Sequence, residues 1–159
     1  MTAPESSIAI ARTAAKAASD KIAEDIVAID VSERLAITDV FLIASAPTER
    51  QVNAIVDGIE EELHKQDLRP VRREGRSEGR WVLLDYAGVV IHVQHQEDRV
   101  FYALERLWKD CPFIDLQLDA KAASTDTEEP GRMGAAGRNR SSAGRPEPPA
   151  DLESVRVSA

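Results

Sequence analysis

Residues 78–94, EGRWVLLDYAGVVIHVQ, contain two short apolar runs that are separated by Ala87 and Gly88. Runs rich in valine, isoleucine and aromatic side chains are typical of β-strands, and a two-residue connection with glycine is typical of a hairpin turn. We therefore predict two antiparallel strands over residues 80–86 and 89–94. The hairpin also holds a Trp, a Tyr, an Asp and a His close together, so it is either a catalytic site or a surface that binds another macromolecule.

The first strand of this hairpin is apolar on both of its faces. Successive side chains of a strand point to opposite sides of the sheet, so Trp81, Leu83 and Asp85 share one face and Tyr86 lies on the other. One face has to pack against helices. The second face is either covered within the same chain or exposed as an interaction surface, and alternation along the strand favours neither alternative.

The chain on either side of the hairpin alternates between helix and strand patterns. The predicted helices are residues 6–23, 47–66 and 97–111, and the further predicted strands are residues 24–31, 39–46 and 69–74. Residues 39–46, DVFLIASA, are apolar without alternation, which is typical of a strand buried on both faces. The order of elements predicts an α/β (α+β) fold, with a mixed sheet of about five strands flanked by helices.

Apolar residues at helical spacing define the helix faces that we expect to be buried. The three expected stripes are Ile8, Ala11, Ala15, Ala18 and Ile22 in the first helix, Val52, Ile55, Val56, Ile59 and Leu63 in the second, and Val100, Ala103, Leu104 and Leu107 in the third. Thr48 stands at the start of the second helix and Gln51 follows three places later, which is the spacing of a capping box.

The composition changes near Asp119. Residues 119–159 contain no aromatic residue and mix alanine, glycine, serine, proline and charged side chains. Such a segment buries too little apolar surface to offset its conformational entropy. We therefore expect one folded domain over residues 1–118 and a disordered tail over residues 119–159.

The charge and the cysteine count limit the possible classes of protein. The 159-residue chain has a formal net charge of -8, which argues against a surface built to neutralise nucleic-acid phosphates and favours a basic protein partner. Cys111 is the single cysteine, so an intramolecular disulfide is impossible and a reducing compartment is expected. We find no signal-peptide pattern and no apolar stretch near the ~20 residues of a membrane span. We expect a cytoplasmic protein without membrane contact.

Patterns for metal, cofactor or nucleophilic chemistry are weak. The histidines lack partners at zinc-site spacing, and Ser45 has no assignable base, so we expect it to form structural hydrogen bonds. No glycine-rich phosphate loop is present. The carboxylates at strand ends, Asp30, Asp39 and Asp85, leave one enzymatic alternative open, a magnesium-dependent nucleotidyl transfer. We expect no metal and no cofactor.

Three blocks of the sequence carry a family resemblance. They are ITDVFLIASAPTERQVNAI (37–55), EGRSEGRWVLLDYAGVVIHV (74–93) and EDRVFYALERLWKDCP (97–112). In this order and spacing they resemble the Iojap family, the ribosomal silencing factor S proteins. The resemblance runs from about Ile8 to Pro112 and so covers the predicted domain.

The resemblance implies a nucleotidyltransferase-like fold without catalytic acids and a non-enzymatic function. Family members bind the large ribosomal subunit through its protein fourteen, a basic partner, and have little direct contact with nucleic acid. They thereby block subunit association and repress translation, and they are expected to form homodimers off the ribosome. This chain departs from the family pattern at Ala87-Gly88, where Gly-Asp is usual, and at Gln94, where Phe is common.

The resemblance and the aromatic content of the hairpin together predict a docking surface. The residues that we expect to form or support it are Trp81, Leu83, Asp85 and Tyr86, with Asp39, Arg50, His92 and Tyr102. Trp81 and Leu83 are expected to supply apolar area, and Asp85 a pair for Lys or Arg of the partner. Two alternatives to silencing stay open, the metal-dependent transferase and a factor for assembly of the large subunit.

Overall fold

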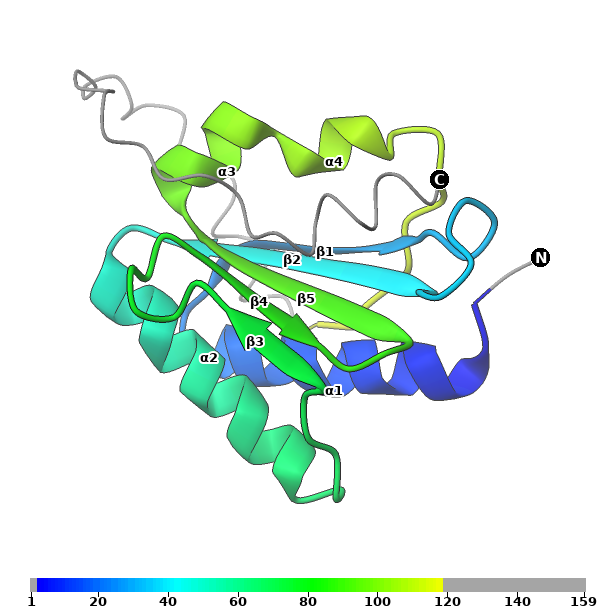
Figure 1. Ribbon diagram of the computed structural model, residues 1–159, viewed down its shortest axis with the longest axis horizontal. Coiled ribbons are helices and arrows are strands. Elements are labelled where there is room, and N and C mark those ends of the chain that lie inside the picture. The colour runs from blue at the N-terminus through cyan, green and yellow to red at the C-terminus, as the bar shows by residue number, and fades with distance from the viewer. Residues whose placement is uncertain (1–2, 119–159) are drawn as a thin grey trace.

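The computed structural model describes residues 3–118, which form one five-stranded sheet with helices on both faces (Figure 1). The elements are α1 (Glu5–Asp20), β1 (Glu24–Asp30), β2 (Val40–Ala46), α2 (Glu49–His64), β3 (Arg72–Glu74), β4 (Trp81–Asp85), β5 (Val89–His95), α3 (Gln96–Tyr102) and α4 (Leu104–Leu107). The predicted fold class, a mixed sheet flanked by helices, is confirmed. The tail expected over residues 119–159 lies outside the described residues.

The strands lie in the order β1-β2-β5-β4-β3. β2 pairs with β5 in parallel, whereas the other neighbours pair antiparallel. All seven residues of β2 are buried, which confirms the strand predicted to be covered on both faces. β3 lies at one edge of the sheet as predicted, but it begins at Arg72 rather than residue 69, so Pro70, which cannot donate to a ladder, precedes the strand.

The predicted hairpin forms between β4 and β5, with Trp81 opposite Gln94 and Leu83 opposite His92. The Tyr86 amide donates to the Val89 carbonyl at 2.8 Å and closes the turn. Ala87 in this turn has a φ of 70°, in the left-handed region that glycine occupies more easily.

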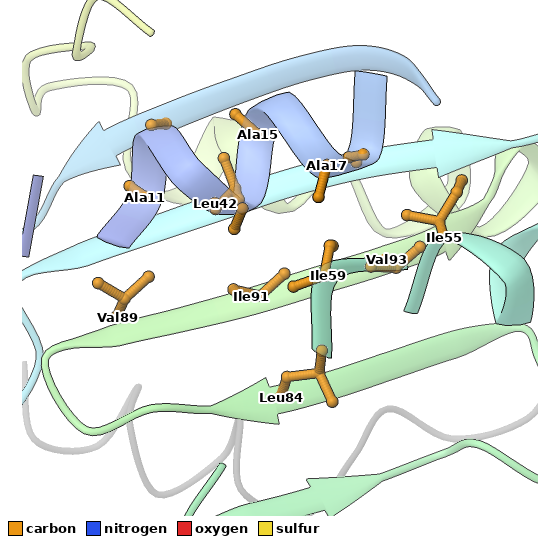
Figure 2. Close-up of a cluster of buried hydrophobic side chains, with 14 of the residues drawn as sticks. Ala11, Ala15, Ala17, Leu42, Ile55, Ile59, Leu84, Val89, Ile91 and Val93 are labelled. Atoms are coloured by element: carbon orange, nitrogen blue, oxygen red, sulfur yellow. The ribbon is translucent and has the colours of Figure 1, made fainter. Parts of the chain in front are cut away.

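The helices α1 and α2 cover one face of the sheet (Figure 1). Every residue of the stripe predicted for α2 is fully buried there, and Figure 2 shows Ile55 and Ile59 pointing toward β5 and β4. The small side chains of α1, among them Ala11, Ala15 and Ala18, let this helix lie close to the strands. The prediction for Ile22 was wrong: α1 ends at Asp20, Ile22 has a φ of 64°, and its side chain is 70% exposed.

The opposite face is covered by α3 and α4, which replace the single helix predicted over residues 97–111. The break is Ala103, whose φ of 44° and ψ of 53° are left-handed. The break gives α3 and α4 different phases, so one continuous stripe across both is not buried, and the prediction was wrong at Val100 and Leu107, which are 78% and 49% exposed. The prediction is confirmed at Leu104, which is 1% exposed, and the turn after α4 also buries Trp108, which the stripe did not include.

Among residues 3–118, the helices are all too short or too polar to cross a membrane.

Candidate docking surface

A chain of aromatic rings runs from the core to the surface beside α3. Phe41 meets His92 edge-on with ring centroids 5.0 Å apart, and the Trp81 indole donates its Nε1 hydrogen to His92 Nδ1 at 3.1 Å. The rings of Trp81 and Tyr102 lie 4.9 Å apart, as do those of Tyr102 and Phe101. Phe101 is 61% exposed, whereas Trp81 is buried. The buried rings thus support an aromatic side chain that faces solvent.

Exposed apolar side chains gather in the segment that holds α3 and α4. Of the seven large hydrophobic residues that are exposed in the described chain, four come from residues 100–113, so the exposed apolar area is concentrated there. Three of these four, Val100, Phe101 and Leu107, lie on α3 and α4 and are called the apolar ridge below, whereas Phe113 lies beyond α4 and bridges to Ile29 of β1. Concentrated apolar exposure of this kind marks an interaction surface more often than scattered single residues do.

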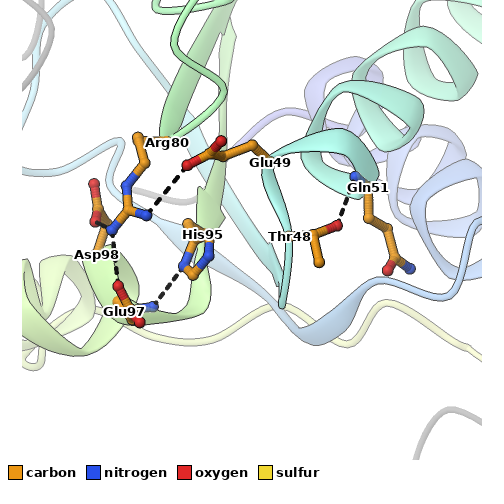
Figure 3. A network of polar contacts seen from close by, with 7 residues as sticks. All are labelled: Thr48, Glu49, Gln51, Arg80, His95, Glu97 and Asp98. Carbon is orange, nitrogen blue, oxygen red and sulfur yellow. Dashed lines mark hydrogen bonds and ion pairs between the residues drawn. The ribbon is translucent and has the colours of Figure 1, made fainter. Parts of the chain in front are cut away.

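Arg80 connects the start of α3 with the rest of the fold (Figure 3). Its guanidinium donates to Asp98 at 2.6 Å, to Glu97 at 3.1 Å and to Glu49 of α2 at 3.4 Å. Burial opposes the charged form, but the hydrogen bonds to Asp98 and Glu97 outweigh it and raise the pKa of Arg80. Gly79 allows this close approach, because its φ is 68° and a Cβ there would lie 3.1 Å from Glu49 Cβ.

Arg99 makes a second set of polar contacts beneath α3. Its guanidinium donates to Ser45 Oγ at 3.2 Å and to Glu105 Oε2 at 3.0 Å. The Ser45 hydroxyl in turn donates to the Glu24 carbonyl at 3.2 Å. These bonds confirm the structural role predicted for Ser45.

The structure places four of the predicted docking residues inside the fold. Trp81, Leu83 and His92 lie under α3 and α4, and none of them is more than 5% exposed. Tyr86 is buried on the opposite face, beneath α1 and α2. Both faces of the hairpin are therefore covered within the chain, which decides the alternative that strand alternation left open.

The other four predicted residues reach the surface at separate places. Tyr102 lies between Trp81 and Phe101, and Arg50 is exposed in the first turn of α2. Asp85 pairs with Arg72 at 3.4 Å and accepts the Ala87 amide, whereas Asp39 accepts the Ser7 hydroxyl at 2.9 Å. The structure thus brings Trp81, Leu83, His92 and Tyr102 together and places the other four predicted residues elsewhere. Their role in docking stays a prediction.

Burial changes the protonation of two predicted residues. It lowers the pKa of His92 to about 3, so the ring is neutral at physiological pH. Because Nδ1 accepts from Trp81, the proton of the neutral ring resides on Nε2, which has no partner among the described residues. Burial, with the nearby Glu60 carboxylate, raises the pKa of Tyr86 to about 12. Both groups therefore act as packing elements near neutral pH.

The carboxylates of the enzymatic alternative are engaged in local hydrogen bonds. Asp30 accepts the Ala3 amide at 2.8 Å and the Ser32 hydroxyl at 2.6 Å, and Asp39 and Asp85 have the partners described above. Within residues 3–118, His, Cys, Asp and Glu form no group of three or more that could hold a metal ion.

The sequence reasoning missed the apolar ridge. The periodicity places Val100 and Leu107 in a buried stripe, and the predicted docking residues do not include Phe101. The missing information was the left-handed Ala103, because alanine is the strongest helix former and marks no break.

Comparison with known proteins identifies the family of this chain. Residues 4–141 match the family described as "Ribosomal silencing factor during starvation". The chain is 41% identical over 107 residues to the ribosomal silencing factor RsfS of Bacillus subtilis, a match that covers 67% of this chain and 91% of that protein. It is 34% identical over 110 residues to the mouse mitochondrial assembly of ribosomal large subunit protein 1, covering 67% of this chain and 48% of that protein.

A solved structure has the same fold. A crystal structure of a Bacillus halodurans protein superposes with a TM-score of 0.58 at 37% sequence identity. The superposition covers 65% of this chain and 93% of the other.

Proposed function

Because this chain belongs to the ribosomal silencing factor family, we propose that it binds the large ribosomal subunit in the cytoplasm, blocks subunit association and so represses translation. The family is named for a regulatory role at the ribosome rather than a catalytic one. The contact that we propose on the large subunit is its protein fourteen, and off the ribosome we propose a homodimer.

The observation that carries this proposal is the apolar ridge on α3 and α4. Phe101 offers an aromatic side chain that is exposed and supported from below by Tyr102 and Trp81. Supported aromatic anchors of this kind contribute disproportionately to protein–protein affinity. The net charge of -8 favours a basic partner over a phosphate backbone.

Trp81 and Leu83 support the ridge rather than contact the partner. To expose them, α4 and the following turn would have to leave the sheet with Leu104 and Trp108. Full burial of a large apolar side chain contributes ~1.5–3 kcal/mol, so exposing four of them costs ~6–12 kcal/mol. That cost approaches the entire stability of a small domain, ~5–15 kcal/mol. We therefore propose that docking leaves the backbone close to its free form.

Asp85 is the proposed electrostatic contact. Its ion pair with Arg72 is 3.4 Å long, and the Arg72 side chain is 53% exposed. Exposed pairs contribute only ~0–1 kcal/mol, so a Lys or Arg of the partner can replace Arg72 at low cost.

A role in assembly of the large subunit is the second candidate. It is favoured by the name of the mouse relative, which refers to mitochondrial assembly of the ribosomal large subunit. Assembly and silencing use the same contact at different times, so a binding assay alone does not separate them. Subunit joining and accumulation of immature large subunits have to be measured in parallel.

The test is co-sedimentation with purified large subunits, small subunits and joined ribosomes over a salt series. We expect binding to free large subunits, with loss of subunit joining. Phe101→Ala should weaken binding about thirtyfold, since truncation of a central aromatic typically costs ~2 kcal/mol. The matched control is Ile22→Ala, because Ile22 is 70% exposed and lies outside the ridge. Equal binding of the wild type to all three particles, or equal losses in both variants, would contradict the proposal.

The homodimer is tested separately by sedimentation equilibrium of the purified chain. We expect a reversible dimer at micromolar concentrations. A monomer at all accessible concentrations would exclude the dimer and leave the proposed docking untouched.

A further inference from the structure

The two short helices that carry the apolar ridge are attached to the sheet by different kinds of contact. α4 begins with Leu104, which is 1% exposed and packs in an apolar cluster with Trp108. The buried residues of α3 are Asp98 and Arg99, both charged. Apolar burial therefore holds α4, whereas charge pairs and hydrogen bonds hold the N-terminal part of α3, whose last residue, Tyr102, also packs its ring against Trp81.

The sheet surface near α3 is polar as well. Ser45 of β2 accepts from Arg99, and Gln94 is its register partner on β5. Gln94 is fully buried, and neither of its amide atoms has a partner among the described residues. Apart from the contact of Tyr102 with Trp81 at its C-terminal end, this region therefore offers α3 little apolar surface, and the orientation of its N-terminal part depends on directional contacts.

Arg80 supplies the strongest of these contacts. Its side chain is 20% exposed, and its guanidinium lies 2.6 Å from the Asp98 carboxylate, which is fully buried. The same guanidinium reaches Glu97 and also Glu49, so it joins the N-terminal turns of α3 and α2. Removing the cation would leave the Asp98 charge buried without this partner, a strongly unfavourable state.

We infer that Arg80 is a positioning residue for docking, because it holds α3 and thereby orients Val100 and Phe101 toward the partner. This inference rests on the proposed function, since it concerns the same ridge. The joint at Ala103 separates α3 from α4, so loss of Arg80 releases α3 while Leu104 keeps α4 in place.

Hydrogen exchange of the free protein tests the positioning without any partner. We compare Arg80→Gln with Arg76→Gln, a matched control, because Arg76 also forms an ion pair with α2, through Asp57, but none to α3. Arg80→Gln should speed exchange of the amides in residues 96–102 about tenfold or more, whereas residues 49–64 keep their protection. Unchanged exchange in α3, or the same increase in the control, would overturn the inference.

Binding to large subunits supplies the second readout through a double-mutant cycle. Arg80→Gln should weaken binding about tenfold in the wild-type background and less than about threefold in a Phe101→Ala background, because both changes remove the same contact. Arg80→Lys, which keeps the charge, should recover part of the affinity. If the losses of binding free energy caused by the two substitutions simply add, Arg80 acts independently of Phe101, and the inference is overturned.

The outcomes separate this inference from the proposed function. If the wild type does not bind large subunits, the proposed function fails, and the exchange experiment still decides whether Arg80 holds α3. If Arg80→Gln does not fold, Glu97→Gln is measured instead, because the Glu97 side chain is 66% exposed and its loss leaves no buried charge. This milder variant should speed exchange in α3 about threefold, and no change would count against the inference.

Discussion

The helices on the two sides of the sheet cover it in different ways. α2 is a continuous helix of 16 residues, and its apolar stripe is buried along its whole length. On the other side, α3 and α4 have seven and four residues and meet at a left-handed alanine. Periodicity locates the buried face only while a helix is continuous, so the same rule succeeded for α2 and failed for Val100 and Leu107.

The largest expected effect compares one residue from each predicted stripe. Ile59→Ala in α2 should lower the free energy of unfolding by ~2–5 kcal/mol, because Ile59 is fully buried and the change leaves a cavity. Val100→Ala in α3 should change it by less than ~0.5 kcal/mol, because Val100 is 78% exposed. Urea denaturation measures both. Similar losses in the two variants would mean that α3 buries its predicted stripe in solution.

A smaller effect concerns His92, which is buried under α3 and α4. Its pKa is about 3 in the folded chain, below the ordinary value of ~6.5 in the unfolded chain. The unfolded state therefore binds the proton first as the pH falls, which lowers the free energy of unfolding. The stability that the neutral His92 ring contributes is fully present above pH ~6.5 and is lost toward pH 3. From pH 7 to pH 5 the free energy of unfolding should fall by ~2 kcal/mol.

The matched variant for this pH dependence is His92→Gln, which cannot titrate. Urea denaturation at pH 7 and pH 5 should show a steeper loss in the wild type than in the variant. If the two proteins lose stability in parallel, His92 does not stay neutral beneath α3 and α4.

The smallest expected effect concerns the backbone break itself. Ala103→Gly should stabilise the protein by ~0.5 kcal/mol, because the left-handed conformation costs alanine ~1–2 kcal/mol and the greater flexibility of unfolded glycine offsets part of that gain. Ala54→Gly, inside continuous α2, should destabilise by ~1 kcal/mol. Thermal unfolding of both variants measures whether the two changes in stability have opposite signs. A loss of stability in both variants would indicate that residue 103 is helical in solution and that α3 and α4 form one helix.

Much of the candidate site was accessible from the sequence because its supporting residues follow local rules. The alternation in β4 correctly placed Trp81 with Leu83 and opposite Tyr86. What alternation could not show is which helix covers which face, since both faces of the strand are apolar. Predicted docking residues such as Trp81 and His92 therefore proved to be the buried support of the ridge, and Phe101 took the exposed position.

The sequence by itself determined the order of the elements, the hairpin at Ala87-Gly88, the buried stripe of α2 and the acidic charge. The charge follows from composition, and the other three depend on neighbours within a few places along the chain, where propensity and periodicity act. The tertiary structure alone decided that the covering helix breaks at Ala103 and that Arg80 meets Asp98 from 18 residues away. Packing against the sheet can hold an alanine in a backbone conformation that its own propensity disfavours, and that break left the apolar ridge facing solvent.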